Sequence, residues 1–172
     1  MFKYNSNHFK KLAYIVLQLA IIIAIFNGVS AFKQRHMLST DDTQARQFRL
    51  LDIHYQPRDI ISPDANKTTL VYFFAPWCTI CHLSIGNLER VHQRNDALNI
   101  VAIALDYQSK NDVDQFVEKH ALSFPILLGN EQVKQAYQIS AYPSYYVLDP
   151  NGVVLHRSMG YSTELGLYLR SL

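Results

Sequence analysis

The pattern of hydrophobic and polar positions divides the chain into an apolar N-terminal run, a polar stretch and a longer alternating region. Residues 12–26 read LAYIVLQLAIIIAIF, with Gln18 as the only polar position, and a more dilute apolar character continues to Phe32. A helix over residues 12–32 would be about 30 Å long, which matches the hydrocarbon thickness of a bilayer. The run therefore predicts a transmembrane anchor or a signal peptide. A buried helix of a globular core is disfavoured because such helices usually keep a polar face.

The residues around this run predict its orientation. The basic residues that precede it are Lys3, Lys10 and Lys11. By the positive-inside rule they place residues 1–11 in the cytoplasm. The small residues Val29 and Ala31 would suit cleavage of a signal peptide after Ala31, but the length of the run favours the uncleaved anchor. Either alternative exports the rest of the chain to the far side of a bacterial inner membrane, into the periplasm, where disulfides form and persist.

Beyond the apolar run, residues 33–46 are polar without a strong period and predict a linker, whereas residues 47–172 alternate between short apolar runs and helical patterns. Strands are predicted over residues 48–53, 59–61, 69–75, 99–105, 124–128, 144–148 and 153–157. Helices are predicted over residues 79–94, 112–120, 131–137 and 163–169. This order predicts an α/β domain with a central mixed β-sheet flanked by helices.

Composition and charge exclude some classes of function. The chain has 172 residues, 49% of them hydrophobic, which suits one compact domain with a short appendage. A net charge of +2 without a Lys- or Arg-rich run in the domain argues against nucleic-acid binding. The only cysteines, Cys78 and Cys81, could close only a very small loop, so a bridge between them would add little stability. We therefore expect the pair to react.

The two cysteines follow a predicted buried strand and open a predicted helix. A helix N-terminus presents free N–H groups and a positive partial charge, which stabilise a thiolate on Cys78. Cys81 lies one turn further along, where it is expected to be covered and able to attack a mixed disulfide formed on Cys78. This spacing predicts that Cys78 is the attacking thiol and Cys81 the resolving thiol.

A proline just before the last hairpin is the second candidate element. Pro143 opens a predicted central strand, which is unusual because proline donates no hydrogen bond to the sheet. Together with the strand, cysteine pair and helix upstream, it predicts a cis bond after Tyr142, with the loop lying against the disulfide. The backbone of Tyr142 could then pair with an extended substrate segment.

The segments FFAPWCTIC, AYP and YYVLDPNGVVLHRSMG resemble the thioredoxin superfamily over residues 47–172. More narrowly, they resemble its TlpA-like branch of membrane-anchored thiol–disulfide oxidoreductases, in the ScsD/DsbE-like subgroup. The resemblance implies a thioredoxin fold with an N-terminal transmembrane helix and a redox-active disulfide in place of any cofactor. It also implies that exported protein thiols and disulfides are the substrates and that a membrane protein of DsbD type donates the electrons. The residues to which it gives roles are Cys78 and Cys81 in redox chemistry and Pro76, Trp77, Tyr142 and Pro143 in support.

Four positions depart from the patterns of these relatives. Ile80 replaces a common proline, Tyr72 a buried acid of thioredoxin, Ser84 a glutamate of some cytochrome-maturation relatives, and Tyr142 the usual Thr or Val. The sequence therefore identifies no base that would deprotonate Cys81. The predicted function is reduction of substrate disulfides in cytochrome c maturation or in copper and redox stress. A disulfide oxidase of the same fold is the alternative.

Two alternatives of another class also fit the segment CTICH. With His82 as an axial ligand it matches the attachment pattern of c-type haem, and Cys78, Cys81 and a histidine could instead bind copper or zinc. The preceding buried strand and the Pro-Trp pair before Cys78 are not needed for a haem site, and a cis-proline beside the sulfurs would hinder metal binding. Four further histidines of the domain are scattered and are predicted to take surface or core positions: His54, His92, His120 and His156.

Overall fold

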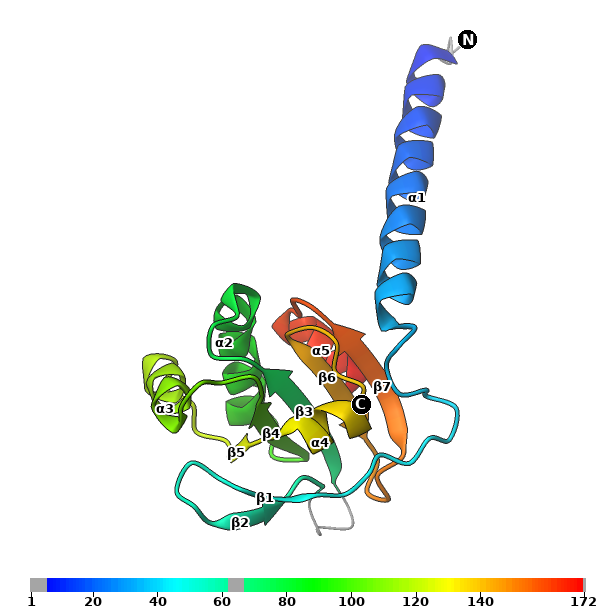
Figure 1. Ribbon diagram of the computed structural model, residues 1–172. Coiled ribbons are helices and arrows are strands. Elements are labelled where there is room, and N and C mark those ends of the chain that lie inside the picture. The colour runs from blue at the N-terminus through cyan, green and yellow to red at the C-terminus, as the bar shows by residue number, and fades with distance from the viewer. Residues whose placement is uncertain (1–5, 62–66, 172) are drawn as a thin grey trace. The chain divides into compact units, whose positions relative to one another are not determined.

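The computed structural model describes residues 6–61 and 67–171, and it divides them into two units (Figure 1). The first unit ends at Arg35 and consists of helix α1 (Ser6–Gln34). None of the helices, judged on the described residues, combines the length and hydropathy that a membrane crossing requires. The anchor predicted over residues 12–32 includes positions 26, 27 and 30–32, whose side chains lie outside the described part.

A five-stranded sheet forms the centre of the second unit, with the order β5-β4-β3-β6-β7 (Figure 1). Its strands are β3 (Thr68–Phe74), β4 (Leu98–Ala104), β5 (Ile126–Leu128), β6 (Ser144–Leu148) and β7 (Val154–Met159). Strand β3 pairs in parallel with β4 and antiparallel with β6, which confirms the predicted mixed sheet. Every residue of β3 after Thr68 is buried, because helices or loops cover both faces of this central strand.

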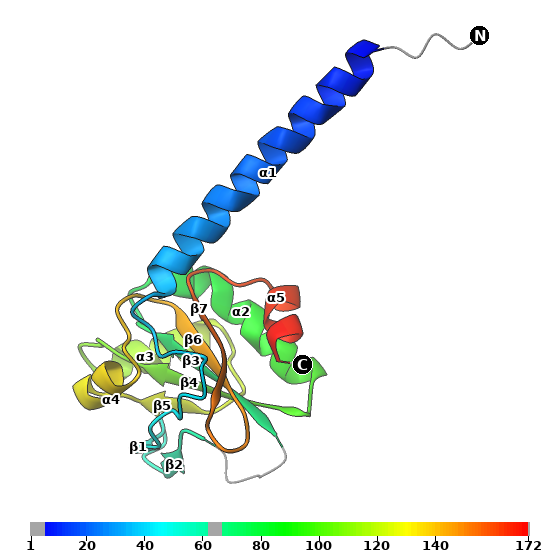
Figure 2. The ribbon, with the colours of Figure 1, turned by 90° about the vertical axis from the view of Figure 1, so that its right-hand side faces the viewer.

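Helices cover the two faces of the sheet unequally. The four helices are α2 (Thr79–Arg94), α3 (Lys110–Lys119), α4 (Glu131–Ala136) and α5 (Glu164–Arg170). Helices α2, α3 and α5 pack on the face that carries Leu70, Tyr72 and Phe74, and α2 and α5 lie side by side there (Figure 2). Helix α4 packs on the opposite face with Val71 and Phe73, since successive side chains of a strand point to opposite faces.

Two segments near the start of this unit differ from the prediction. Strand β1 (Arg49–Leu51) lies within its predicted range, but its partner β2 is Pro57–Asp59, two residues before the predicted start. The Asp52 carboxylate explains the shift, because it closes the intervening turn by accepting hydrogen bonds from the backbone N–H of His54 and Gln56 and from the Arg58 side chain.

Part of the predicted linker belongs to the second unit, which begins at His36. Met37 and Ala45 are buried in the core on the α4 side of the sheet. The N–H of Ala45 donates to the carbonyl oxygen of Gly152 at 2.8 Å, and Arg157 donates to the carbonyl oxygen of Met37 at 2.8 Å. The composition of residues 33–46 does not reveal these contacts, because both use backbone carbonyl oxygens as acceptors.

Candidate active site

Helix α2 begins directly after Cys78, close to the end of strand β3. Cys78 is the N-cap residue with an extended backbone, and its Sγ atom accepts a hydrogen bond from the N–H of Cys81 at 3.1 Å. Its own N–H donates to the carbonyl oxygen of Ala75 at 3.0 Å, which tightens the turn between strand and helix. A free N–H in the first turn of the helix is thus aimed at the Cys78 sulfur.

The two thiols, both free, differ in their environment. The exposed fraction is 6% for Cys78 and 0% for Cys81. Burial raises the pKa of the Cys81 thiol far above its usual range, and a hydrogen bond with Cys78 raises it further. Cys81 is therefore protonated near neutral pH. Both side chains are thus buried, and only Cys78 keeps a small exposed fraction.

The peptide bond between Tyr142 and Pro143 is cis, as predicted. The Tyr142 ring packs edge-on against the Trp77 ring, with their centroids 5.9 Å apart. Trp77 and Pro143, which lie far apart in the sequence, thus belong to one site. Pro76 and Trp77 also line the wall of a neighbouring groove.

Asp106 connects Trp77 and Tyr142, although no role was predicted for it from the sequence. Its carbonyl oxygen accepts the indole N–H of Trp77 at 2.8 Å, and its carboxylate accepts the Tyr142 hydroxyl at 3.0 Å and the Lys134 ammonium at 2.6 Å. Burial and the bond to Asp106 both raise the pKa of Tyr142, so this hydroxyl stays protonated as a donor. The signal that could have revealed Asp106 is its position just past β4, because β3 and β4 are parallel neighbours whose ends meet.

Two histidines meet beside the cysteines. The Nδ1 atom of His82, on α2, lies 2.7 Å from the Nε2 atom of His120, at the end of α3, so one ring donates to the other. Both rings also pack on Phe116, at 4.6 and 4.8 Å between centroids. Burial lowers the pKa of His120, and the nearby His82 and Lys119 lower it further. His120 is therefore not an isolated residue, although nothing in the sequence linked it to His82.

A groove of about 430 Å³ runs between the start of α2 and helix α3. Its lining mixes aromatic and polar side chains and includes Pro76, Trp77, His82, Tyr107, Asp112, Phe116 and Lys119. It offers space next to Cys78 for a side chain of a bound polypeptide. By contrast, no three His, Cys, Asp or Glu side chains among the described residues gather closely enough to hold a metal ion.

Residues 42–157 match the AhpC/TSA family. The thioredoxin-like protein YneN of Bacillus subtilis is 25% identical over 158 residues, which are 90% of this chain and 92% of that protein. The thiol-disulfide oxidoreductase ResA of Oceanobacillus iheyensis is 28% identical over 158 residues, 88% of this chain and 80% of that protein.

Solved structures share the fold. StoA from Bacillus subtilis superposes with a TM-score of 0.66 at 21% identity, covering 74% of this chain and 98% of that chain. A thiol:disulfide interchange protein of the thioredoxin family from Chlorobium tepidum gives a TM-score of 0.68 at 20% identity, covering 78% of this chain and 97% of that chain. The thioredoxin fold predicted from the sequence is thereby confirmed.

The histidine pair predicts a pH dependence of stability. Because the pKa of His120 is lowered in the folded chain, the unfolded state binds this proton more readily. The free energy of unfolding should therefore fall as the pH drops from about 7 to about 5. His120→Gln should make this fall shallower in urea unfolding measured at both pH values. His156→Gln, which removes an exposed histidine of β7, is the control and should keep the wild-type slope. Equal slopes for wild type and His120→Gln would contradict this account.

Proposed function

Because the chain belongs to the AhpC/TSA family, we propose that it is a protein thiol–disulfide oxidoreductase in which Cys78 and Cys81 cycle between dithiol and disulfide. The observation that carries this proposal is the contrast between Cys78, which caps the helix and keeps a small exposed fraction, and the fully buried Cys81 one turn further on. Such a pair stores two electrons in its own sulfur atoms, so the proposed reaction requires no bound cofactor.

The proposed reduction has two steps. In the first, the Cys78 thiolate attacks one sulfur of a substrate disulfide, the substrate S–S bond breaks, and the other substrate sulfur departs as a thiolate. In the second, Cys81 loses its proton and attacks the Cys78 sulfur, which breaks the mixed disulfide and releases the substrate sulfur that was bound to Cys78. Two electrons have then passed from the cysteine pair to the substrate, and Cys78 and Cys81 are joined by a disulfide.

We assign the supporting residues to binding of the substrate polypeptide. Trp77 is 65% exposed and lies directly before the nucleophile, so its ring can cover apolar side chains next to the substrate cysteine. Tyr142 packs against the Trp77 ring, and its backbone beside the cis Pro143 would pair with an extended segment. The hydrogen bonds of Asp106 to Trp77 and Tyr142 support this assignment, because they hold these two side chains in place.

The N-terminal unit supports a membrane location. The large apolar side chains of α1 that are at least half exposed are Leu12, Tyr14, Ile15, Val16, Leu17, Leu19, Ile21, Ile22, Ile23, Ile25 and Val29. Such a surface is unfavourable in water and favourable in lipid. We infer that residues 12–32 anchor the chain in a bacterial inner membrane with the domain in the periplasm. In this arrangement, a DsbD-type membrane protein would return electrons to the disulfide, and the domain would act as a reductase.

The division of roles between the cysteines predicts opposite behaviour of two variants. Cys81→Ser keeps the attacking thiol but cannot resolve the mixed disulfide, so it should accumulate covalent complexes with substrate proteins. Cys78→Ser should form none and lose all exchange activity, and it serves as the matched control. Non-reducing electrophoresis of acid-quenched cells, followed by reduction, measures both. An active wild type combined with a Cys81→Ser variant that traps nothing would contradict the assigned roles.

Location and direction of electron flow are tested together in growing cells. Acid quench and thiol alkylation after fractionation should find the chain with the membranes and its Cys78–Cys81 pair mostly reduced. A reduced pair in an oxidising compartment requires a donor that keeps it so. Recovery in the soluble periplasmic fraction would contradict the anchor. A mostly oxidised pair would contradict the reductase and favour the oxidase alternative.

A further inference from the structure

The buried Cys81 thiol needs help to become a nucleophile, a requirement that rests on the proposed function. It is fully buried, and burial raises its pKa far above the usual range. Its negative charge has to develop away from water while it attacks Cys78. A polar group that faces the sulfur inside the core would therefore act directly on the resolving step.

Buried carboxylates do not fill this role in the described part of the chain. Two acidic residues are buried there, Asp52 and Glu89. Asp52 is bound by Arg58 at 2.7 Å in the turn before β2. Glu89 accepts hydrogen bonds from the N–H of Ser123 at 2.9 Å and from Gln93. Both carboxylates are thus occupied by partners of their own.

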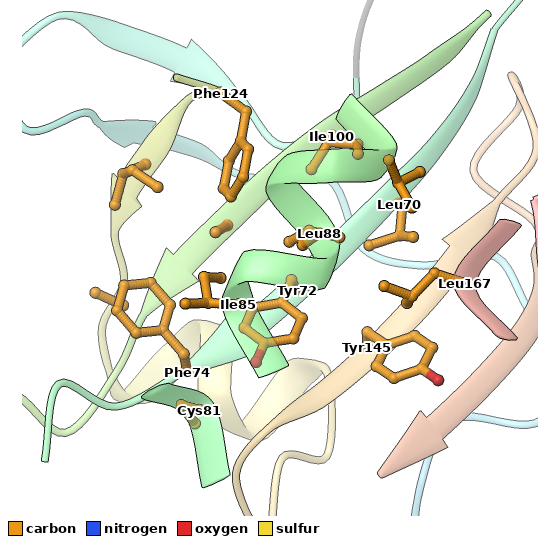
Figure 3. Packing of buried hydrophobic residues seen from close by; sticks show 14 of the residues in the cluster. Leu70, Tyr72, Phe74, Cys81, Ile85, Leu88, Ile100, Phe124, Tyr145 and Leu167 are labelled. Atoms are coloured by element: carbon orange, nitrogen blue, oxygen red, sulfur yellow. The ribbon is translucent and has the colours of Figure 1, made fainter. Parts of the chain in front are cut away.

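Tyr72, whose hydroxyl group pairs with that of Ser84, belongs instead to the buried cluster that also contains Cys81. Their oxygen atoms are 2.7 Å apart, and each residue is only 2% exposed. Tyr72 stands on the face of β3 that packs against α2, with its hydroxyl end pointing toward the end of the helix that carries Cys81 (Figure 3). Ser84 is three residues after Cys81 on α2 and therefore lies on the same side of the helix.

The pKa values of Tyr72 and Cys81 fit an arrangement in which Ser84 donates to the Tyr72 oxygen and Tyr72 donates to the Cys81 sulfur. Tyr72 lowers the pKa of the Cys81 thiol, which opposes the larger effect of burial. Burial also raises the pKa of Tyr72 well above its usual value, so the phenol keeps its proton. When Ser84 donates to the Tyr72 oxygen, the phenol proton is left for the Cys81 sulfur.

We propose that Tyr72 is a catalytic hydrogen-bond donor to the Cys81 sulfur in the resolving step, and that Ser84 is a positioning residue that holds the Tyr72 hydroxyl. As the Cys81 S–H bond breaks, its sulfur bonds to the Cys78 sulfur, and the bond between Cys78 and the substrate breaks. The departing substrate sulfur takes the electron pair and the proton from Cys81. Tyr72 keeps its own proton and stabilises the charge that develops on Cys81.

Tyr145 provides a matched control for the loss of a buried tyrosine hydroxyl. It lies opposite Tyr72 on the neighbouring strand β6 and is fully buried in the same core (Figure 3). Its hydroxyl, however, contacts Ser162 and accepts a hydrogen bond from Arg170 at 2.5 Å. Tyr145→Phe therefore removes a similar group from the same core at a position that does not donate to Cys81.

The test uses the reduced full chain with one equivalent of the aromatic disulfide dithiobis(nitrobenzoate). Attack by Cys78 releases one coloured nitrothiobenzoate, and attack by Cys81 on the mixed disulfide releases the second. We expect Tyr72→Phe to leave the first phase unchanged and to slow the second about tenfold, the effect of losing one hydrogen bond to a charged group. Ser84→Ala should slow the second phase about threefold. Tyr145→Phe should change neither phase.

The outcomes separate this inference from the proposed function. If the wild type releases no second nitrothiobenzoate, the cysteine pair does not exchange and the proposed function fails. If the wild type shows both phases and Tyr72→Phe matches it, only the role of Tyr72 is overturned. A second phase slowed equally in Tyr72→Phe and Tyr145→Phe would also overturn it, because the effect would then follow from a loosened core.

Discussion

Helix α2 has to begin directly after Cys78, close to the end of the buried strand β3, and the rest of the site depends on this junction. The hydrogen bond from the Cys81 N–H to the Cys78 sulfur places Cys78 at the helix cap and Cys81 in the first turn. It also places Ser84 above the face of β3 that carries Tyr72. A helix that started one residue later would rotate each of these side chains by about 100° and separate the pairs.

Neutral groups, rather than charged ones, surround the inner thiol. Burying a carboxylate beside Cys81 would demand its own desolvation and a partner. Two hydroxyl groups cost less to bury than a charge, and here they satisfy each other at 2.7 Å. Charged groups lie at the rim instead, where Asp106 bridges Trp77, Tyr142 and Lys134. This division keeps charged groups out of the core, while hydrogen bonds to Asp106 hold the Trp77 and Tyr142 side chains in place.

The sequence allowed prediction of those parts that depend on local pattern. The unbroken apolar run of β3, the helix from Thr79 to Arg94 and the cis bond before Pro143 all follow from residue spacing and chemistry. The contacts that were missed join distant positions. Tyr72 and Ser84 are 12 residues apart, Asp106 and Tyr142 are 36 apart, and His82 and His120 are 38 apart. They arise from helix packing and parallel strand pairing, which no single-segment pattern encodes.

The asymmetry between the two thiols is the central claim of this account, and site-resolved alkylation of the reduced full chain tests it most directly. Under native conditions, with modified peptides assigned by mass spectrometry over time, Cys78 should react first and Cys81 should stay protected until the chain is unfolded. The cause is that Cys81 is fully buried and its pKa is raised. Equal rates at the two cysteines, or faster modification of Cys81, would contradict the account.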